Sequence, residues 1–400
     1  MDKLTVRDID VAGKRVFLRA DLNVPLEDGR ITDDSRIRAS LPTLRYLLEH
    51  GAGVVLASHL GRPKGKVNDA LRLKPVADRL AQLLRRPVRM TGDALGPGVV
   101  DAVGKLRPGD LLMLENLRFH AEEESNDPAF AEALAKLADV YVNDAFGSAH
   151  RAHASTEGIT HFLPSVAGLL LEREVDGLSR LLKRPPKPFM AVIGGAKVSD
   201  KLEVLEALLG RCAAVLVGGG MANTFLAAKG HAMGKSLVEK DQIENAARIA
   251  TEARRKRVRL MLPVDAVVAA QIHVRSQTEV VAVSDVPRDW SVVDIGPRTI
   301  EAFAQVLEKA MTIFWNGPMG VFEIAPFAEG TNAVARIVAE RTDAGATTIV
   351  GGGDSLAAVE RLGLTDRMTH VSTGGGASLE FVEGKPLPGV EALLDTGSAA

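Results

Sequence analysis

The chain has 400 residues, enough for two hydrophobic cores, and predicts two domains because single domains usually span about 100–200 residues. Its 49 lysines and arginines nearly balance 51 aspartates and glutamates, and aromatic residues make up only 4%, so no nucleic-acid partner is expected. The single cysteine, Cys212, excludes an intrachain disulfide. The sequence shows no signal-peptide pattern, and no apolar run approaches the length of about 18 residues that a membrane helix needs. These features predict a cytoplasmic protein with no membrane partner.

Short, continuously apolar runs recur along the whole chain and predict strands. They lie at 15–18, 54–57, 111–114, 140–142, 189–193, 214–217, 260–262, 312–315 and 347–350. Continuous rather than alternating apolar residues are typical of parallel strands buried on both faces. Amphipathic stretches between them, most clearly 129–138, 201–209 and 299–310, predict helices. This alternation predicts an α/β fold with two doubly wound, Rossmann-like parallel sheets and a cleft between the two domains.

The strongest break in the pattern is the segment Arg184-Pro185-Pro186-Lys187-Pro188, which cannot continue a helix. The residues before it, 166–183, predict one amphipathic helix that connects the domains. We therefore place an N-terminal domain at 1–170, a connecting helix and proline-rich link at 171–185, and a C-terminal domain at 186–387.

Polar side chains in the first half cluster directly after the predicted strands, where open parallel sheets bind ligands. The arginines among them are Arg36, Arg62, Arg118 and Arg151, near Asn23, His59 and His150. Because a guanidinium fork matches phosphate and carboxylate oxygens, this set predicts a site for a small, densely anionic ligand. Asp21 orients such arginines, hydrogen-bonds a ligand hydroxyl or caps a turn. The alternative is a scatter of surface arginines in salt bridges.

Glycine is over-represented, with 38 residues, and every adjacent pair or triple lies in the second half. The clusters that begin at Gly194, Gly218 and Gly351 follow predicted strands, and those at Gly351 and Gly374 open predicted helical segments, where exposed backbone N–H groups bind phosphate. The alternative is tight turns and close helix–sheet packing. Lys197 and Lys201 would share one face if their stretch is helical, and they suit a nucleotide polyphosphate. The carboxylate of Asp354, within a glycine loop, suits Mg²⁺.

Several familiar fingerprints are absent. No G-x-G-x-x-G follows a strand, which disfavours a dinucleotide oxidoreductase, and the segment 230–236 has one residue too few for a P-loop. Neither an H-E-x-x-H zinc motif nor a G-x-S-x-G nucleophile elbow occurs.

Taken together, these segments resemble the phosphoglycerate kinase family along essentially the whole chain. The matching motifs are Leu18–Pro25, Ser58–Pro63, Glu115–Phe119, Asn143–His153, Gly194–Lys201, Trp315–Glu323, Gly351–Ser355 and Ser372–Ser378. One small departure is Leu22, where family members often carry phenylalanine.

The resemblance implies an N-terminal domain that binds 3-phosphoglycerate or 1,3-bisphosphoglycerate and a C-terminal domain that binds ADP or ATP with Mg²⁺. The implied phosphoglycerate ligands are Asp21, Asn23, Arg36, His59, Arg62, Arg118 and Arg151. The implied nucleotide ligands are Lys201, Glu323, Gly352, Gly353, Asp354 and Ser355, with Glu323 on the ribose and Asp354 at the metal. It also implies a monomer whose tail, 388–400, packs on the N-terminal domain.

The implied reaction is direct, reversible phosphoryl transfer from 1,3-bisphosphoglycerate to MgADP, a glycolytic step that forms ATP. We assign charge stabilisation to Arg36, Lys197, Lys201 and the backbone N–H groups near Gly353 and Gly375. These groups come from two domains, so hinge closure is expected to gate turnover. Two alternatives are another two-domain transferase acting on a different phosphorylated acid, and a non-catalytic binding protein with this fold.

Overall fold

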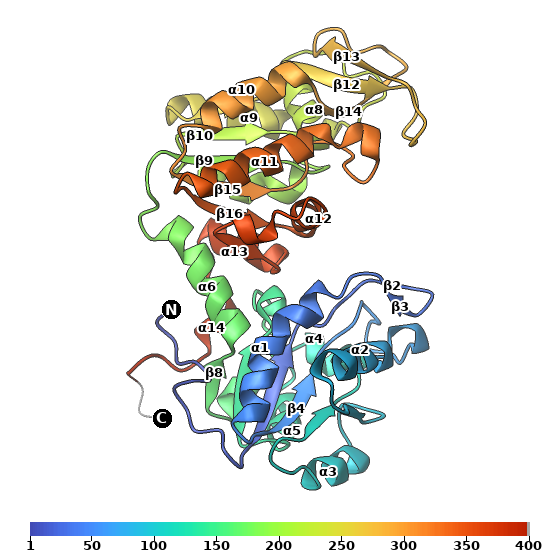
Figure 1. Ribbon diagram of the computed structural model, residues 1–400, viewed down its shortest axis with the longest axis vertical. Coiled ribbons are helices and arrows are strands. Elements are labelled where there is room, and N and C mark those ends of the chain that lie inside the picture. The colour runs from blue at the N-terminus through green and yellow to red at the C-terminus, as the bar shows by residue number, and fades with distance from the viewer. Residues whose placement is uncertain (398–400) are drawn as a thin grey trace. The chain divides into compact units, whose positions relative to one another are not determined.

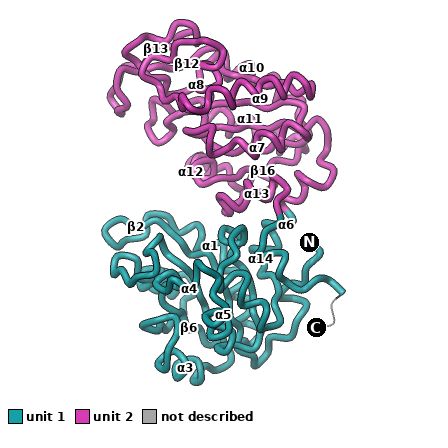
Figure 2. Tube along the Cα trace, turned by 180° about the vertical axis from the view of Figure 1, so that it is seen from behind, with its two compact units in different colours: residues 1–176, 386–400 teal, residues 177–385 magenta. Residues whose placement is uncertain are grey.

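In the computed structural model, which describes residues 1–397, the chain forms two compact units (Figures 1 and 2). The N-terminal unit contains Met1–Asp176 and the described part of Pro386–Ala400, and the C-terminal unit contains Gly177–Lys385. The division falls within helix α6 (Leu169–Leu182). The last three residues of the tail predicted to pack on the N-terminal domain, 398–400, lie outside the described residues.

The N-terminal unit is built on a six-stranded sheet with the order β5-β6-β4-β1-β7-β8, and every neighbouring pair is parallel. Its strands are β1 (Arg15–Ala20), β4 (Gly53–Ala57), β5 (Arg89–Met90), β6 (Leu111–Met113), β7 (Val140–Asp144) and β8 (Ser165–Ala167). Its other helices are α1 (Ser35–Glu49), α2 (Lys74–Leu84), α3 (Pro97–Gly104), α4 (Ala121–Glu124), α5 (Pro128–Ala135) and α14 (Pro388–Glu391). A two-stranded hairpin, β2 (Leu26–Glu27) and β3 (Arg30–Ile31), follows β1.

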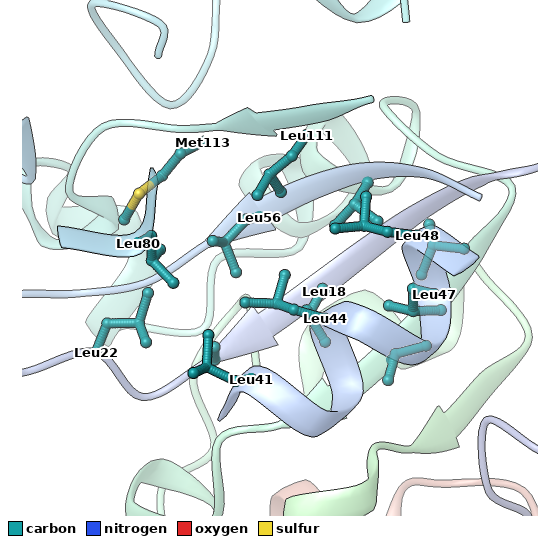
Figure 3. Close-up of a cluster of buried hydrophobic side chains, with 14 of the residues drawn as sticks. Leu18, Leu22, Leu41, Leu44, Leu47, Leu48, Leu56, Leu80, Leu111 and Met113 are labelled. Atoms are coloured by element: carbon teal, nitrogen blue, oxygen red, sulfur yellow. The ribbon is translucent and has the colours of Figure 1, made fainter. Parts of the chain in front are cut away.

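The core of this unit lies between the sheet and helix α1 (Figure 3). Leu41, Leu44 and Leu48 recur at helical spacing and turn one apolar face of α1 toward Leu18 of β1 and Leu56 of β4. Burying one such leucine contributes about 1.5–3 kcal/mol. This packing holds α1 against the sheet. Arg36 lies in the first turn of α1, so the same helix contributes to the core and to the predicted anion site.

The C-terminal unit has a second all-parallel sheet of six strands, in the order β11-β10-β9-β15-β16-β17. Numbered along the chain within this sheet, the order is 3-2-1-4-5-6, the arrangement of doubly wound nucleotide-binding folds. Its strands are β9 (Phe189–Ile193), β10 (Ala214–Val217), β11 (Arg259–Met261), β15 (Thr312–Asn316), β16 (Thr347–Gly351) and β17 (His370–Ser372). Its helices are α7 (Leu202–Leu208), α8 (Gly219–Ala228), α9 (Ile243–Arg255), α10 (Pro297–Leu307), α11 (Glu329–Asp343), α12 (Gly353–Arg361) and α13 (Gly376–Glu383).

The same unit carries an antiparallel sheet that the sequence did not predict. It consists of β13 (Thr278–Ala282), β12 (Asp265–Ala269) and β14 (Ser291–Ile295), in that order. The strand β13 includes the apolar residues Val280, Val281 and Ala282, but it is exposed or half-buried throughout, unlike the strands of the two parallel sheets.

One predicted helix was wrong at its start. The range 166–183 was expected to be helical, but Val166 and Ala167 belong to β8, which pairs with β7. The helix α6 begins only at Leu169, after Gly168.

The C-terminal tail up to residue 397 packs on the N-terminal unit. The Gly389 N–H donates to the Ala149 carbonyl at 2.9 Å, and Asn143 Nδ2 donates to the Gly389 carbonyl at 2.8 Å. The Leu4 N–H donates to the Leu394 carbonyl at 2.8 Å. Within residues 1–397, no helix has the length and apolarity needed to cross a membrane.

Candidate functional site

The loops that carry the predicted anion-binding residues leave one edge of the N-terminal sheet. Arg19 of β1 is in register with Ala57 of β4 on one side and with Asn143 of β7 on the other. The strands are parallel, so the segments that follow them emerge at the same carboxyl edge. This edge also holds the point where the strand order reverses around β1, the usual ligand position in such sheets.

A chain of hydrogen bonds joins four of the predicted residues at this edge. Arg36 Nη1 lies 3.0 Å from both carboxylate oxygens of Asp21, and the Asn23 N–H donates to Asp21 Oδ1 at 3.2 Å. Asn23 Oδ1 accepts the Gly61 N–H at 2.8 Å, and Arg118 Nη1 donates to the Gly61 carbonyl at 3.0 Å. Asp21 therefore orients an arginine, which was one of the roles the sequence left open. Burial opposes its charge, but Arg36, His59 and Arg19 hold the pKa of Asp21 below its usual value.

Sequence reasoning missed Arg19, which is completely buried in β1. Its Nη2 lies 3.1 Å from His59 Nδ1, and its Nε donates to Ser155 Oγ at 2.8 Å. Ser155 Oγ in turn donates to the buried carboxylate of Glu123 at 2.6 Å. A guanidinium can only donate, so His59 Nδ1 is the acceptor and the neutral ring carries its proton on Nε2. An arginine inside an otherwise apolar strand run was the signal for this residue.

The positive groups at this edge repel one another. Burial lowers the pKa of His59 well below its usual value, and Arg19, Arg118 and Arg36 lower it further, although Asp21 opposes them. Burial, Arg118, Arg19 and Arg151 lower the pKa of His153 to about 3. The pKa of Arg118 itself is lowered by burial and by Arg19 and Arg151, although Glu124, whose carboxylate lies 3.3 Å from Arg118 Nε, opposes the shift. An anionic ligand would relieve this repulsion, so the edge is suited to bind one.

The remaining predicted residues of this half take different positions. Arg151 is half-buried, and its Nε donates to His150 Nε2 at 3.1 Å. Arg62 is exposed, in the loop that follows β4. The hydrogen-bonded chain thus contains Asp21, Asn23, Arg36 and Arg118, with His59 beside it, and it does not include Arg62 or Arg151.

The register of the C-terminal sheet likewise brings four loops to one edge. Asn316 of β15 is in register with Ile193 of β9 and with Gly351 of β16, and Gly351 is in register with Ser372 of β17. The glycine clusters that follow three of these strands therefore emerge side by side. The strand order reverses between β9 and β15, so this edge is the expected position for a nucleotide.

Lys201 lies at this edge and is half-buried. Its ammonium donates to Asn316 Oδ1, and the Asn316 carbonyl is 3.5 Å away. Burial lowers the pKa of Lys201 to about 8, although Asp354 and Asp200 oppose that shift. Asn316 was not predicted; its Nδ2 is buried and has no hydrogen-bond partner in the described chain. A polar residue at the end of an apolar strand run was the available signal.

Helix α12 presents the other predicted phosphate-binding backbone. Gly352 precedes it with φ of 92°, and a Cβ there would lie 3.0 Å from Asn316 Nδ2, so a side chain is disfavoured. Ser355 Oγ accepts the Gly317 N–H at 2.6 Å and ties α12 to the loop after β15. Gly353 and Asp354 are exposed in the first turn of α12, where an anion is favoured.

The residues present fit a magnesium ion that is held largely by its nucleotide. Residues 1–397 contain no group of three or more His, Cys, Asp and Glu side chains arranged to hold a metal ion. Asp354 offers one carboxylate beside Lys201, and Mg²⁺ commonly uses one or two carboxylates together with phosphate oxygens.

The stretch from Lys197 to Lys201 is not an α-helix, so the condition under which these two lysines would share a helical face is not met. Lys197 is exposed in a loop, Lys201 ends the short 3₁₀ helix η5 (Ser199–Lys201), and α7 begins at Leu202. Glu239, which sequence reasoning missed, holds this loop by accepting the N–H groups of Val198 at 2.5 Å and of Ser199 at 3.1 Å.

The last two predicted residues, Gly375 and Glu323, lie in the segments that follow β17 and β15. Gly375 directly precedes α13 with φ of 55°. Glu323 is exposed in the segment between β15 and α11.

Comparison with known proteins identifies the family to which this pair of sites belongs. The family model described as phosphoglycerate kinase matches residues 6–385. The chain belongs to the phosphoglycerate kinase family. It is 58% identical to the phosphoglycerate kinases of Moorella thermoacetica, over 395 residues, and of Chloroflexus aurantiacus, over 398 residues; each alignment covers 99% of this chain and 100% of the relative.

Solved phosphoglycerate kinase structures share the fold. The Coxiella burnetii structure has a TM-score of 0.85 at 43% identity, and the Pyrococcus horikoshii structure has a TM-score of 0.88 at 37% identity. Both comparisons cover 98% of this chain and 98% of the solved chain. The protein is therefore an enzyme of glycolysis, a transferase with phosphoglycerate kinase activity.

Proposed function

We propose that the N-terminal unit binds the phosphoglycerate and that the C-terminal unit binds the nucleotide. The observation that carries this division is the arginine-rich edge of the N-terminal sheet, where Arg19 contacts His59 and where burial, together with Arg19, Arg118 and Arg36, lowers the pKa of His59. Asp21, Asn23, Arg62 and Arg151 complete the proposed phosphoglycerate site. The proposed nucleotide site consists of Lys201, Glu323, Gly352, Gly353, Asp354 and Ser355.

The transfer is proposed to be direct and in line, from the acyl phosphate of 1,3-bisphosphoglycerate to the β-phosphate of ADP. Both the attacking phosphate oxygen and, in reverse, the carboxylate oxygen are ionised at pH 7, so no general base is required. The protein's task is then to position the two ligands and to cancel charge on the moving group.

Arg36 is the proposed stabiliser from the N-terminal unit, because Asp21 already holds its guanidinium at 3.0 Å from both carboxylate oxygens. Lys197, Lys201 and the backbone N–H near Gly375 are the proposed stabilisers from the C-terminal unit. Asp354 would hold Mg²⁺ against the nucleotide phosphates; the bound ion supplies charge neutralisation on those oxygens.

Direct transfer requires both ligands to meet, so hinge closure is proposed to gate turnover. The ends of α6 and the approach to Ser372 are the proposed hinges. Small-angle X-ray scattering tests this: the radius of gyration should fall when both ligands are bound, and an unchanged value would contradict closure. We further propose that the enzyme works as a cytoplasmic monomer with Mg²⁺ and small-molecule ligands only, which sedimentation measurements on the purified protein test.

The division of ligands is tested by calorimetric titration of wild type, Arg118→Met and the control Arg89→Met. Arg89 is an exposed arginine in β5, paired with Asp110 at 2.9 Å. Losing one buried charge-assisted contact should weaken 3-phosphoglycerate binding about tenfold or more in Arg118→Met, with ATP binding unchanged. The control should match wild type for both ligands. Equal 3-phosphoglycerate affinity in all three proteins would refute the N-terminal assignment, and a coupled assay without ATP consumption would refute the reaction.

A further inference from the structure

The segment 320–330, here called the ribose segment, carries Glu323; it contains the short 3₁₀ turn η7 (Ala325–Phe327) and ends in the first turn of α11 (Glu329–Asp343). The side chain of Glu323 is exposed, whereas its neighbour Phe322 is buried and its neighbour Ile324 is half-buried. A side chain that binds a ribose needs a fixed backbone beneath it, because misplacement by about 1 Å is costly. The contacts that hold the two ends of this segment therefore determine where Glu323 lies.

The buried carboxylate of Asp294, in β14, contacts both ends of the ribose segment. It is 1% exposed, and its Oδ2 accepts the Gly330 N–H at 2.6 Å. A Cβ at Gly330 would lie 2.3 Å from Asp294 Oδ1, and a Cβ at Gly320 would lie 2.5 Å from the same atom. The neighbouring Val293 carbonyl accepts the Val321 N–H at 2.8 Å. Strand β14 thus holds the start and the end of the segment against one side chain.

The environment of Asp294 disfavours the charged form of its carboxyl group. Burial raises the pKa of Asp294 to about 7, and Glu329 adds to the rise, although the N–H groups of Gly330 and Ile295 oppose it. The folded protein therefore disfavours this carboxylate while using its oxygen atoms as acceptors. A second buried carboxylate, Asp265 of β12, is 2% exposed and accepts the Arg298 and Thr299 N–H groups at 3.0 and 2.8 Å, but it caps α10 rather than the ribose segment.

Arg361 holds the middle of the ribose segment from a different element. Its Nη1 donates to the Phe322 carbonyl at 2.7 Å, and its guanidinium lies 5.4 Å from the centre of the Phe322 ring. Its Nη2 donates to Asn332 Oδ1 at 3.0 Å, in the first turn of α11. Arg361 is the last residue of α12, the helix whose first turn carries Gly353 and Asp354. One side chain therefore connects the phosphate-binding helix to the peptide next to Glu323.

We propose that Asp294 and Arg361 are positioning residues for the nucleotide, acting through the backbone of the ribose segment and not through contact with the ligand. This proposal rests on the proposed role of Glu323 in nucleotide binding. All the contacts that carry it lie within the C-terminal unit, so it concerns one ligand and leaves the phosphoglycerate site unaffected.

The test compares steady-state kinetics of wild type, Asp294→Asn, Arg361→Gln and Glu323→Gln with two matched controls. Asp265→Asn removes a buried carboxylate that caps another helix, and Arg255→Gln removes an exposed arginine in the last turn of α9, where it pairs with Glu252 at 2.7 Å. KM is measured separately for MgATP and for 3-phosphoglycerate, and thermal unfolding is recorded for every variant. Arg361 is exposed, so its variant should fold even where Asp294→Asn does not.

The KM for MgATP should rise about tenfold in Asp294→Asn and about threefold in Arg361→Gln, with the KM for 3-phosphoglycerate and the controls within about twofold of wild type. The double variant Asp294→Asn/Glu323→Gln should be no worse than Glu323→Gln alone, because both changes remove one interaction. A purely structural role predicts additive losses, or equal rises in both KM values, and either would overturn the proposal.

The design separates this inference from the proposed function. If Glu323→Gln raises the KM for MgATP while Asp294→Asn and Arg361→Gln do not, only the positioning roles are overturned. If Glu323→Gln leaves that KM unchanged, the ribose assignment fails and the inference fails with it. If wild type shows no turnover, the proposed function fails at the first measurement.

Discussion

The pKa of Lys201 makes nucleotide use pH-dependent within an accessible range. Burial places the pKa of this ammonium at about 8 in the free protein, below its usual value of 10.5. With that pKa, about nine-tenths of the molecules carry the charge at pH 7 and about one-tenth at pH 9. If the charged form binds the nucleotide phosphates, kcat/KM for MgATP should fall about tenfold between these pH values.

The assay is an initial-rate series from pH 7 to 9.5 at constant ionic strength, in wild type and in Lys201→Arg. A guanidinium stays charged throughout, so the variant should lose the inflection near pH 8, even though its fork geometry lowers the absolute rate. The kcat/KM for 3-phosphoglycerate at saturating MgATP serves as the internal control for effects on the other site. A wild-type profile that is flat to pH 9, or a Lys201→Arg profile with the same inflection, would refute the reasoning.

Four further predictions concern single side chains. Arg36→Ala should lower kcat by about 100-fold or more while calorimetric ATP affinity stays within about twofold; near-normal turnover would remove Arg36 from charge stabilisation. Asp354→Asn should raise the Mg²⁺ concentration needed for half-maximal rate, and an unchanged metal dependence would contradict the assignment. Gly177→Ala should lower the free energy of unfolding, because the new Cβ would lie 2.5 Å from His370 Cγ, and overpacking of about 1–3 kcal/mol outweighs the helix gain of about 1 kcal/mol; a raised Tm would contradict this. Asp294 has a folded pKa of about 7, above its usual 3.8, so its contribution to stability falls as pH rises from 4 to 7; Asp294→Asn should remove that slope in denaturant titrations, and identical slopes would refute it.

The strands of the two large sheets were predictable because parallel strands buried on both faces leave continuous apolar runs. The predicted ranges 189–193 and 214–217 coincide with β9 and β10. The strand β8 escaped prediction because Val166 and Ala167 are apolar residues that continue into the apolar face of α6. Periodicity alone could not separate a three-residue edge strand from the helix after it. Strand β13 was missed although Val280, Val281 and Ala282 form a short apolar run, because these residues are exposed or half-buried and do not follow the pattern of a strand buried on both faces.

The candidate site was predictable where residues stand at strand ends, as Asp21, Arg118 and Asp354 do. It was not predictable where a polar residue supports a site residue that is distant in the sequence. Arg19 lies within β1 and reaches His59 through the interior of the unit, so its partner is set by strand register and not by sequence distance. Glu239 is likewise 40 residues from the Ser199 N–H that it accepts. Such pairs become visible only when the sheet brings the loops together.

The excess of glycine in the second half of the sequence has two structural causes, which only the surroundings of each glycine distinguish. Gly194, Gly219 and Gly317 are packing positions, since a Cβ on each would lie 2.1, 2.6 and 2.3 Å from a backbone oxygen of a neighbouring loop. At Gly353 and Gly375, by contrast, no described atom apart from the adjoining residues and the backbone of the same helix lies within 4 Å of the position of a Cβ. The first group allows the loops of the C-terminal sheet to converge, and the second leaves backbone N–H groups accessible to a ligand. Both alternatives left open by the sequence, close packing and a phosphate-binding backbone, are therefore served by different glycines of the C-terminal unit.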